Sequence, residues 1–196
     1  RDRDVEARLE RFRDAMKAAR GRVDAWSFDR GEEGVRAVRG GLEKTTRRAV
    51  RAFEAAREDP TPEKLHEWRK RVKYHRYHTR LLRDLWPEGL GARLEAVHRL
   101  SDLLGDDHDL AVLRRTLTDE PARFGPRSRL ASLLGLLEVR RAELQAWALP
   151  LATRLHADPK KPAKRFVARV ERYWRAWEEE RRLANALPDA SGEIPA

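Results

Sequence analysis

The sequence contains no cysteine, and this absence excludes disulfide bonds and thiolate chemistry. It has no run of eighteen apolar residues that would predict a membrane-spanning helix, and its N-terminal residues lack the apolar segment of a secretory signal. The alternation of apolar and polar residues that is typical of strands is rare, which favours helices. We therefore expect a cytoplasmic protein with no membrane partner.

The motifs of common enzyme classes are absent as well. The sequence has no Gly-rich phosphate-binding loop, no Ser, His and Asp in a supporting context, and no spaced pair of buried carboxylates. It also has no HExxH or CxxC spacing, and the acids and histidine of residues 106–109 are too close in sequence to face one ion from a helix. We expect a non-catalytic protein without a metal ion or a cofactor.

Charge is what the chain has in excess. Its 196 residues include 43 Lys and Arg against 33 Asp and Glu, which gives a net charge of +10, while a hydrophobic content of 40% is enough for a core. A basic balance of this size favours polyanionic partners, such as nucleic acid, anionic lipid or polyphosphate.

The strongest basic segment is residues 64–83, which hold eight Lys or Arg and a single acid, Glu67. At 100° per residue, one face is apolar and predicts a core contact: Leu65, Trp68, Val72, His75, Thr79, Leu82 and Trp86. The other face is cationic and includes His66, Arg69, Lys70, Lys73, Tyr77 and Arg80, while Arg76 lies at the border between the two faces. The first candidate binding residues are His66, Arg69, Lys70, Lys73 and Arg76. Like charges on one helix face repel each other, so this face favours an anionic partner, and Arg, Lys and His suit phosphate.

Two motifs in this order resemble those of the CHAD family, the conserved histidine α-helical domain. The first is L-H-x-x-R-K-R-x-K-x-x-R-Y from Leu65 to Tyr77, and the second is the LLGDDHDL segment from Leu103 to Leu110. The resemblance implies an all-helical domain of two related bundles. It also implies a central groove or pore, lined by basic residues, that binds inorganic polyphosphate.

The hydrophobic periodicity predicts seven helices, near residues 2–20, 35–58, 63–86, 90–104, 107–117, 128–156 and 162–186. Gly21 and Gly105 are expected to end helices, Asp106 or Asp107 to cap the next one, and Pro150 to kink or split the sixth. Thr61 and Pro62 are expected to start the third helix. The predicted fold is an all-α antiparallel helical bundle, with one complete four-helix-type repeat and part of another.

The domain organisation follows from the family resemblance. Residues 1–30 are interpreted as a remnant of a first repeat, because Asp2 to Val5 can be aligned with Asp107 to Leu110, although chance similarity explains four positions equally well. Residues 34–187 are expected to form the main bundle, and residues 188–196 a disordered tail.

Further basic residues are second-rank candidates for the same ligand. Residues 160–172 hold six Lys or Arg against one Glu, and His108 is expected in the first turn of a helix, where an anion is favoured. These candidates are Lys44, Arg48, Arg51, His108, Arg165, Arg169 and Arg172.

Together, these patterns predict a non-catalytic domain that binds inorganic polyphosphate through a basic helical surface. Two alternatives stay open, a helical nucleic-acid-binding module and an adaptor for acidic proteins. Nucleic acid is also a candidate competitor of polyphosphate for the basic surface. Association with polyphosphate granules also stays open.

Overall fold

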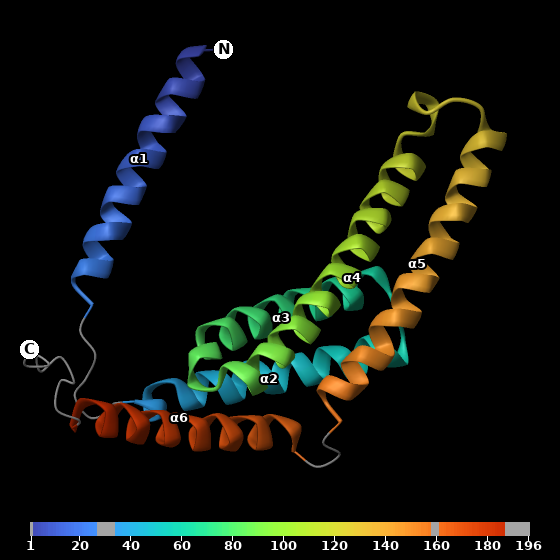
Figure 1. Cartoon of the computed structure of the whole chain (residues 1–196). Helices are drawn as coiled ribbons and strands as arrows, with labels where there is room; N and C mark the ends of the chain where they lie inside the picture. The colour runs from blue at the N-terminus through green and yellow to red at the C-terminus, as the bar shows by residue number, and fades with distance from the viewer. Residues whose placement is uncertain (1, 27–33, 158–160, 187–196) are drawn as a thin grey trace, which may run out of the picture. The chain divides into compact units, whose positions relative to one another are not determined.

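The computed structural model describes residues 2–26, 34–157 and 161–186. These residues form six α-helices and two short 3-10 helices and include no strand, which confirms the all-α fold (Figure 1). The elements are α1 (Asp2–Asp24), α2 (Val35–Glu58), α3 (Pro62–Leu81), η1 (Arg83–Leu85), α4 (Pro87–Asp119), η2 (Pro121–Arg123), α5 (Arg127–Leu155) and α6 (Pro162–Ala186).

The chain divides into two compact units, residues 1–37 and 38–196. The first consists mainly of α1, which continues past Gly21 to Asp24, so the predicted end at that glycine is wrong. The apolar residues that share one face of α1 are 50–63% exposed: Val5, Leu9, Phe12 and Met16. The interpretation of residues 1–30 as a repeat remnant stays a prediction, and the predicted tail, residues 188–196, lies outside the described residues.

The main core of the second unit lies between α2, α3, α4 and α5. Trp68 of α3 is fully buried and packs beside Phe53 of α2, with their ring centroids 5.4 Å apart. The remaining buried residues of this core are Ala56, Leu65, Val72, Val97, Leu100, Leu104, Ala148 and Ala152. The apolar face predicted for α3 is therefore confirmed from Leu65 to Leu82. Leu82 itself belongs to a second core, with residues of α2, α4 and α6.

Helix α3 begins where the sequence predicts but ends earlier. The Thr61 side chain accepts a hydrogen bond from the backbone N–H of Lys64 at 3.3 Å, and Pro62 occupies the first turn. The helix ends at Leu81, and η1 then turns the chain toward α4. Trp86 consequently lies outside α3 and is 41% exposed, so its placement on the core stripe is wrong.

Helix α4 is a single helix of 33 residues, where the sequence predicts two helices divided at Gly105. Glycine in a helix interior costs only about 1 kcal/mol relative to alanine, and burial on both sides of Gly105 offsets that cost. Leu104 and Asp107 are both buried against neighbouring helices. Asp106 and Asp107 are thus interior helical residues, and neither caps a helix.

Helices α4 and α5 form a long antiparallel pair, because Leu117 packs near Leu130 and Asp107 contacts Arg141. Helix α5 runs through Pro150 without a break, so the predicted split is wrong. Buried Ala148 and Ala152 hold the chain on either side of that proline within the main core. Part of the α4–α5 pair extends beyond the other helices of the unit (Figure 1).

Candidate functional site

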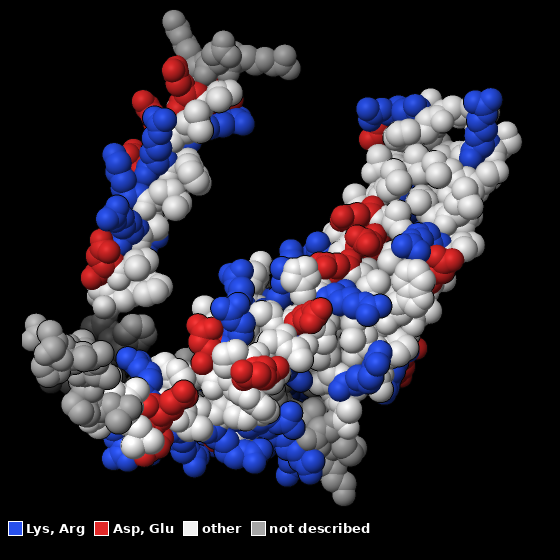
Figure 2. All heavy atoms as spheres, in the orientation of Figure 1, with Lys and Arg blue, Asp and Glu red and all other residues white. Residues whose placement is uncertain are grey.

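The basic residues of α2 and α6 lie on exposed helix surfaces. Lys and Arg side chains follow α6 along the lower edge of the molecule (Figure 2), and Arg165, Arg169 and Arg172 are all exposed there. Lys44, Arg48 and Arg51 are exposed on α2. Arg51 lines a cavity of about 490 Å³ with Lys161 and Lys164, although Glu43 and Glu54 line it too, so its charge is mixed.

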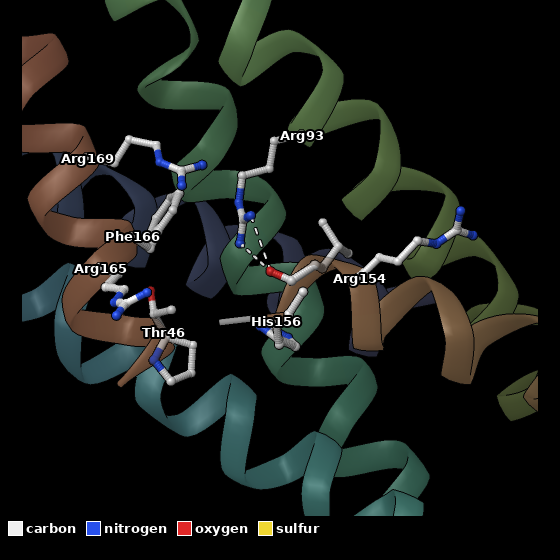
Figure 3. Close-up of a pocket in the computed structure, with 10 residues that line it drawn as sticks. Thr46, Arg93, Arg154, His156, Arg165, Phe166 and Arg169 are labelled. Atoms are coloured by element: carbon white, nitrogen blue, oxygen red, sulfur yellow. Dashed lines mark hydrogen bonds between the residues drawn. The ribbon is translucent and has the colours of Figure 1, made fainter. Parts of the chain in front are cut away.

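A more strongly cationic cavity lies between α2, α4, α5 and α6. It measures about 370 Å³, and its described lining includes no acidic residue. The guanidinium groups of Arg93, Arg165 and Arg169 lie around it, while the side chain of Arg154 points away from them (Figure 3). We call this the arginine cavity, and its other described lining residues are Thr46, Leu155, His156, Ala157, Pro162 and Phe166.

Arg93 is held in a fixed position at the inner end of this cavity. Its Nε and Nη2 lie 3.2 and 3.0 Å from Nε2 of His75, and its Nη1 and Nη2 donate to the Leu155 carbonyl oxygen at 3.4 Å. Its guanidinium also lies 4.5 Å from the centroid of the Phe166 ring. Burial, with a contribution from Arg169, lowers the pKa of Arg93 to about 10, so it stays charged at neutral pH.

Two histidines beside Arg93 are uncharged at neutral pH. Burial is the main cause that lowers the pKa of His156 to about 4, and the Arg93 charge adds to it. The same two causes place the pKa of His75 well below its ordinary value. Neutral His75 is consistent with Nε2 accepting a hydrogen bond from Arg93.

Sequence reasoning places Arg165 and Arg169 in a binding surface but misses Arg93, Arg154, His156 and Thr46. One signal for Arg93 is present in the sequence, since this lone cation lies three residues from Leu90 and four from Val97 on the core stripe of α4. No comparable pattern marks His156, which enters the cavity only because α5 ends at Leu155.

The basic face of α3 consists of His66, Arg69, Lys70, Lys73 and Arg76. Arg69, Lys73 and Arg76 are half-buried, and within the described part of the chain no acid forms an ion pair with them. Nε of Arg69 is buried without a hydrogen-bond partner there, 3.9 Å from the point that a Cβ on Gly105 would occupy.

Lys70 differs from the other cations of this face. Its Nζ lies 2.8 Å from Oε2 of Glu67, and Arg71 pairs with the same carboxylate. The hydrogen bond from Lys70 is the largest cause that lowers the pKa of Glu67. Lys70 is therefore partly neutralised, whereas the half-buried cations of the face are not.

His66 of the basic face meets His108 of α4. Their ring centroids are 4.7 Å apart, and burial followed by the Arg69 charge lowers the pKa of His108. The predicted place of His108, in the first turn of a helix, is wrong, because it lies in the middle of α4. His108 nevertheless lies against His66 of the basic face, and its role as a ligand residue stays a prediction.

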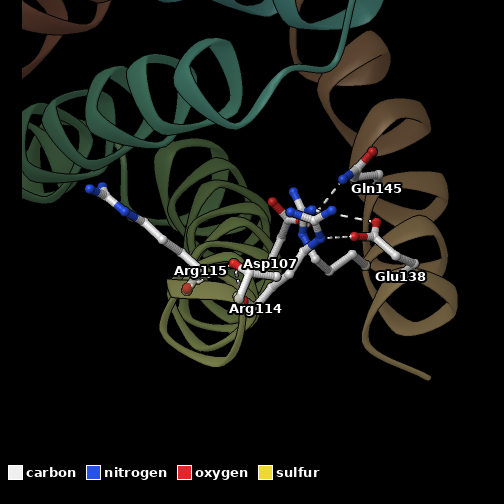
Figure 4. A network of polar contacts seen from close by, with 7 residues as sticks. Asp107, Arg114, Arg115, Glu138 and Gln145 are labelled. Carbon is white, nitrogen blue, oxygen red and sulfur yellow. Dashed lines mark hydrogen bonds and ion pairs between the residues drawn. The ribbon is translucent and has the colours of Figure 1, made fainter. Parts of the chain in front are cut away.

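A cavity of about 480 Å³ adjoins the two histidines, and its cations are mostly paired. Arg114 forms an ion pair with Glu138, and Arg115 points to the other side of α4 (Figure 4). Asp107 accepts hydrogen bonds from Nε of Arg141 at 3.2 Å and from Nε2 of Gln145 at 2.8 Å. Asp107 and Arg141 are buried, so this network fastens α4 to α5 and does not supply charge for a ligand.

The predicted residues thus fall into separate groups. His66, Arg69 and His108 come together at the contact of α3 and α4, and Arg165 comes together with Arg169 at the arginine cavity. Within the described lining of that cavity there is no residue of the α3 basic face.

The sequence model of the CHAD domain family matches residues 1–118, which is more than half of the chain. The chain belongs to the CHAD domain family. The matched segment includes both motifs that resemble the family, Leu65 to Tyr77 and Leu103 to Leu110. Helices α5 and α6 lie outside it. No curated protein and no solved structure gives a significant match. Among the described residues, no helix has both the length and the apolar composition that a bilayer requires.

Proposed function

We propose that the chain binds inorganic polyphosphate along the basic face of α3 and does not catalyse a reaction on it. Membership of the CHAD family supports this function, because polyphosphate binding is what the resemblance implied. Lys44, Arg48, Arg51 and Arg172 would extend the binding surface beyond α3 as exposed cations.

One observation carries the proposal, which is the row of half-buried cations that have no acidic partner in the described structure. Arg69, Lys73 and Arg76 follow each other at spacings of four and three residues, or about 5 Å along the helix axis. Cations that are partly removed from water and lie beside one another repel, and an anion removes that cost. A linear chain of phosphates supplies one negative charge after another along such a row.

His108, which meets His66 at one end of the row, adds a pH-sensitive contact. His108 is uncharged at neutral pH because of burial and Arg69. A phosphate beside His108 would stabilise its protonated imidazole, so binding takes up a proton and strengthens as the pH falls.

A competition experiment separates polyphosphate from nucleic acid as the ligand. The full chain is first bound to labelled long-chain polyphosphate at physiological salt, and unlabelled polyphosphate or duplex DNA is added at matched phosphate concentration. We expect polyphosphate to displace the label at a much lower concentration than DNA. Equal displacement by DNA would identify a general polyanion surface. No binding of polyphosphate would contradict the proposal and leave nucleic acid or an acidic protein as the partner.

A further inference from the structure

The arginine cavity differs from the α3 face in shape as well as in position. A volume of about 370 Å³ falls in the range of cavities that enclose small ligands. The cavity is walled by Phe166, Leu155 and Pro162, with arginine guanidinium groups between them. Pro162 also begins α6, and a helix N-terminus favours negative charge.

Arg93 gives this cavity a permanent positive charge. It is largely buried and stays charged, yet its hydrogen-bond partners are a neutral histidine and a carbonyl oxygen. Nearby Arg169 adds a second positive charge, and within the described residues neither arginine forms an ion pair. A buried charge without a counter-charge is costly, and a bound anion would provide one.

The chemistry of the lining selects phosphate among anions. Guanidinium groups present paired N–H donors that match the oxygens of a phosphate, and two or more of them can grip one group from different sides. Arg93 from α4 and Arg165 and Arg169 from α6 are placed for such a grip (Figure 3). The Thr46 hydroxyl is committed to the Leu42 carbonyl oxygen and supplies no donor.

An aromatic cavity of about 400 Å³ adjoins the arginine cavity and shares Arg93, Phe166 and Arg169 with it. Its wall includes Trp86 and Tyr173, whose rings meet edge to face with centroids 4.4 Å apart. A ligand with its phosphate among the arginines therefore has room for an organic group against aromatic rings.

We infer that the arginine cavity is a second anion site, which binds the phosphate group of a small phosphorylated ligand and is separate from the α3 basic face. The site does not depend on polyphosphate binding. Arg154, His156, Arg165 and Arg169 come from elements outside the segment that matches the family. Helix α3 contributes through His75, which accepts a hydrogen bond from Arg93 and lies against the rings of Phe166 and His156.

Calorimetric titration with pyrophosphate tests this inference on the full chain. We expect saturable binding to the wild type, and a loss of roughly ten- to hundredfold in affinity for Arg169→Ala, since one charged hydrogen-bonding partner is removed. Arg175→Ala is the matched control, because Arg175 is also exposed on α6 but is not among the described lining residues. The control should bind like the wild type.

Two further arms complete the test. Arg69→Ala with Lys73→Ala, which alters the α3 face, should leave pyrophosphate binding unchanged. A folded wild type that does not bind pyrophosphate, or an equal loss in the Arg175 control or the α3 variant, would overturn the inference. A titration with ADP identifies the source of the phosphate. If ADP binds more tightly than pyrophosphate and Tyr173→Leu abolishes the difference, the ligand is a nucleotide. If ADP and pyrophosphate bind equally, the ligand is inorganic.

Discussion

Arg93 and its two histidine neighbours show how a single buried cation changes the chemistry around it. The charge of Arg93 makes protonation of His75 and His156 unfavourable, and burial acts in the same direction. The histidines in turn leave Arg93 without a negative partner. Arg93 is therefore a buried positive charge whose neighbours, His75 and His156, are neutral.

This arrangement predicts a loss of stability in acid. Between pH 6.5 and about 4 the unfolded chain protonates His156, whereas the folded chain does not, so the free energy of unfolding falls as the pH falls through this window. For a pKa near 4, protonation of His156 in the unfolded chain lowers the free energy of unfolding by about 3 kcal/mol at the lower end of this pH window. His75 adds a loss in the same direction.

Chemical denaturation at pH 7 and pH 4.5 measures this effect. His156→Gln removes the titrating group, and we expect it to show a clearly smaller drop in the free energy of unfolding than the wild type. An identical drop in both proteins would mean that His156 titrates normally and is not buried beside Arg93.

At the scale of elements, α4 determines where both candidate sites lie. Its middle carries His108 to the α3 face, and its first half carries Arg93 to the arginine cavity. Helices α3 and α4 are antiparallel. His66, near the start of α3, contacts His108, and His75, further along α3, contacts Arg93, which precedes His108 in α4. A break at Gly105 would uncouple these two regions.

The continuity of α4 predicts that Gly105→Ala is stabilising. An added Cβ would lie 3.9 Å from Nε of Arg69, an ordinary van der Waals contact, and alanine is favoured over glycine in a helix interior by about 0.5–1 kcal/mol. Gly125→Ala is the contrasting variant, because Gly125 has a φ of +98°, and we expect it to be destabilising. Thermal unfolding distinguishes the two, and a destabilised Gly105→Ala would indicate a turn at that residue.

The amphipathic period of α3 was sufficient to predict its buried face, since burial from Leu65 to Leu82 follows the helical spacing. The sequence failed where tertiary contacts override local preference. Gly105 is kept helical by the cores on either side of it, and Asp107 pairs with Arg141, which is 34 residues away. Arg93 was missed for a similar reason, because its contacts come from α3, from the end of α5 and from α6, through His75, Leu155 and Phe166.

At the scale of the whole molecule, the excess charge of +10 is distributed unevenly. Many surface cations pair with acids, such as Arg123 with Glu120 and Arg140 with Glu143. Such exposed pairs contribute little to stability or to the field of the protein. Among the described residues, no acid forms an ion pair with Arg69, Lys73 and Arg76 of α3, or with Arg93 and Arg169 at the arginine cavity. These are the cations that we propose for recognition of an anion.

Binding of long-chain polyphosphate as a function of salt concentration tests the role of the α3 face most directly. The measurement compares the wild type, Arg69→Ala with Lys73→Ala, and Arg123→Ala with Arg140→Ala as a control that loses the same charge from paired residues. Each phosphate contact that is lost lowers the slope of log affinity against log salt by about 0.7 for a single-stranded polyanion. We predict a slope lower by roughly 1.4 for the α3 variant, with wild-type slope in the control and unchanged melting temperatures in both. A full wild-type slope in the folded α3 variant would contradict the assignment of the binding face.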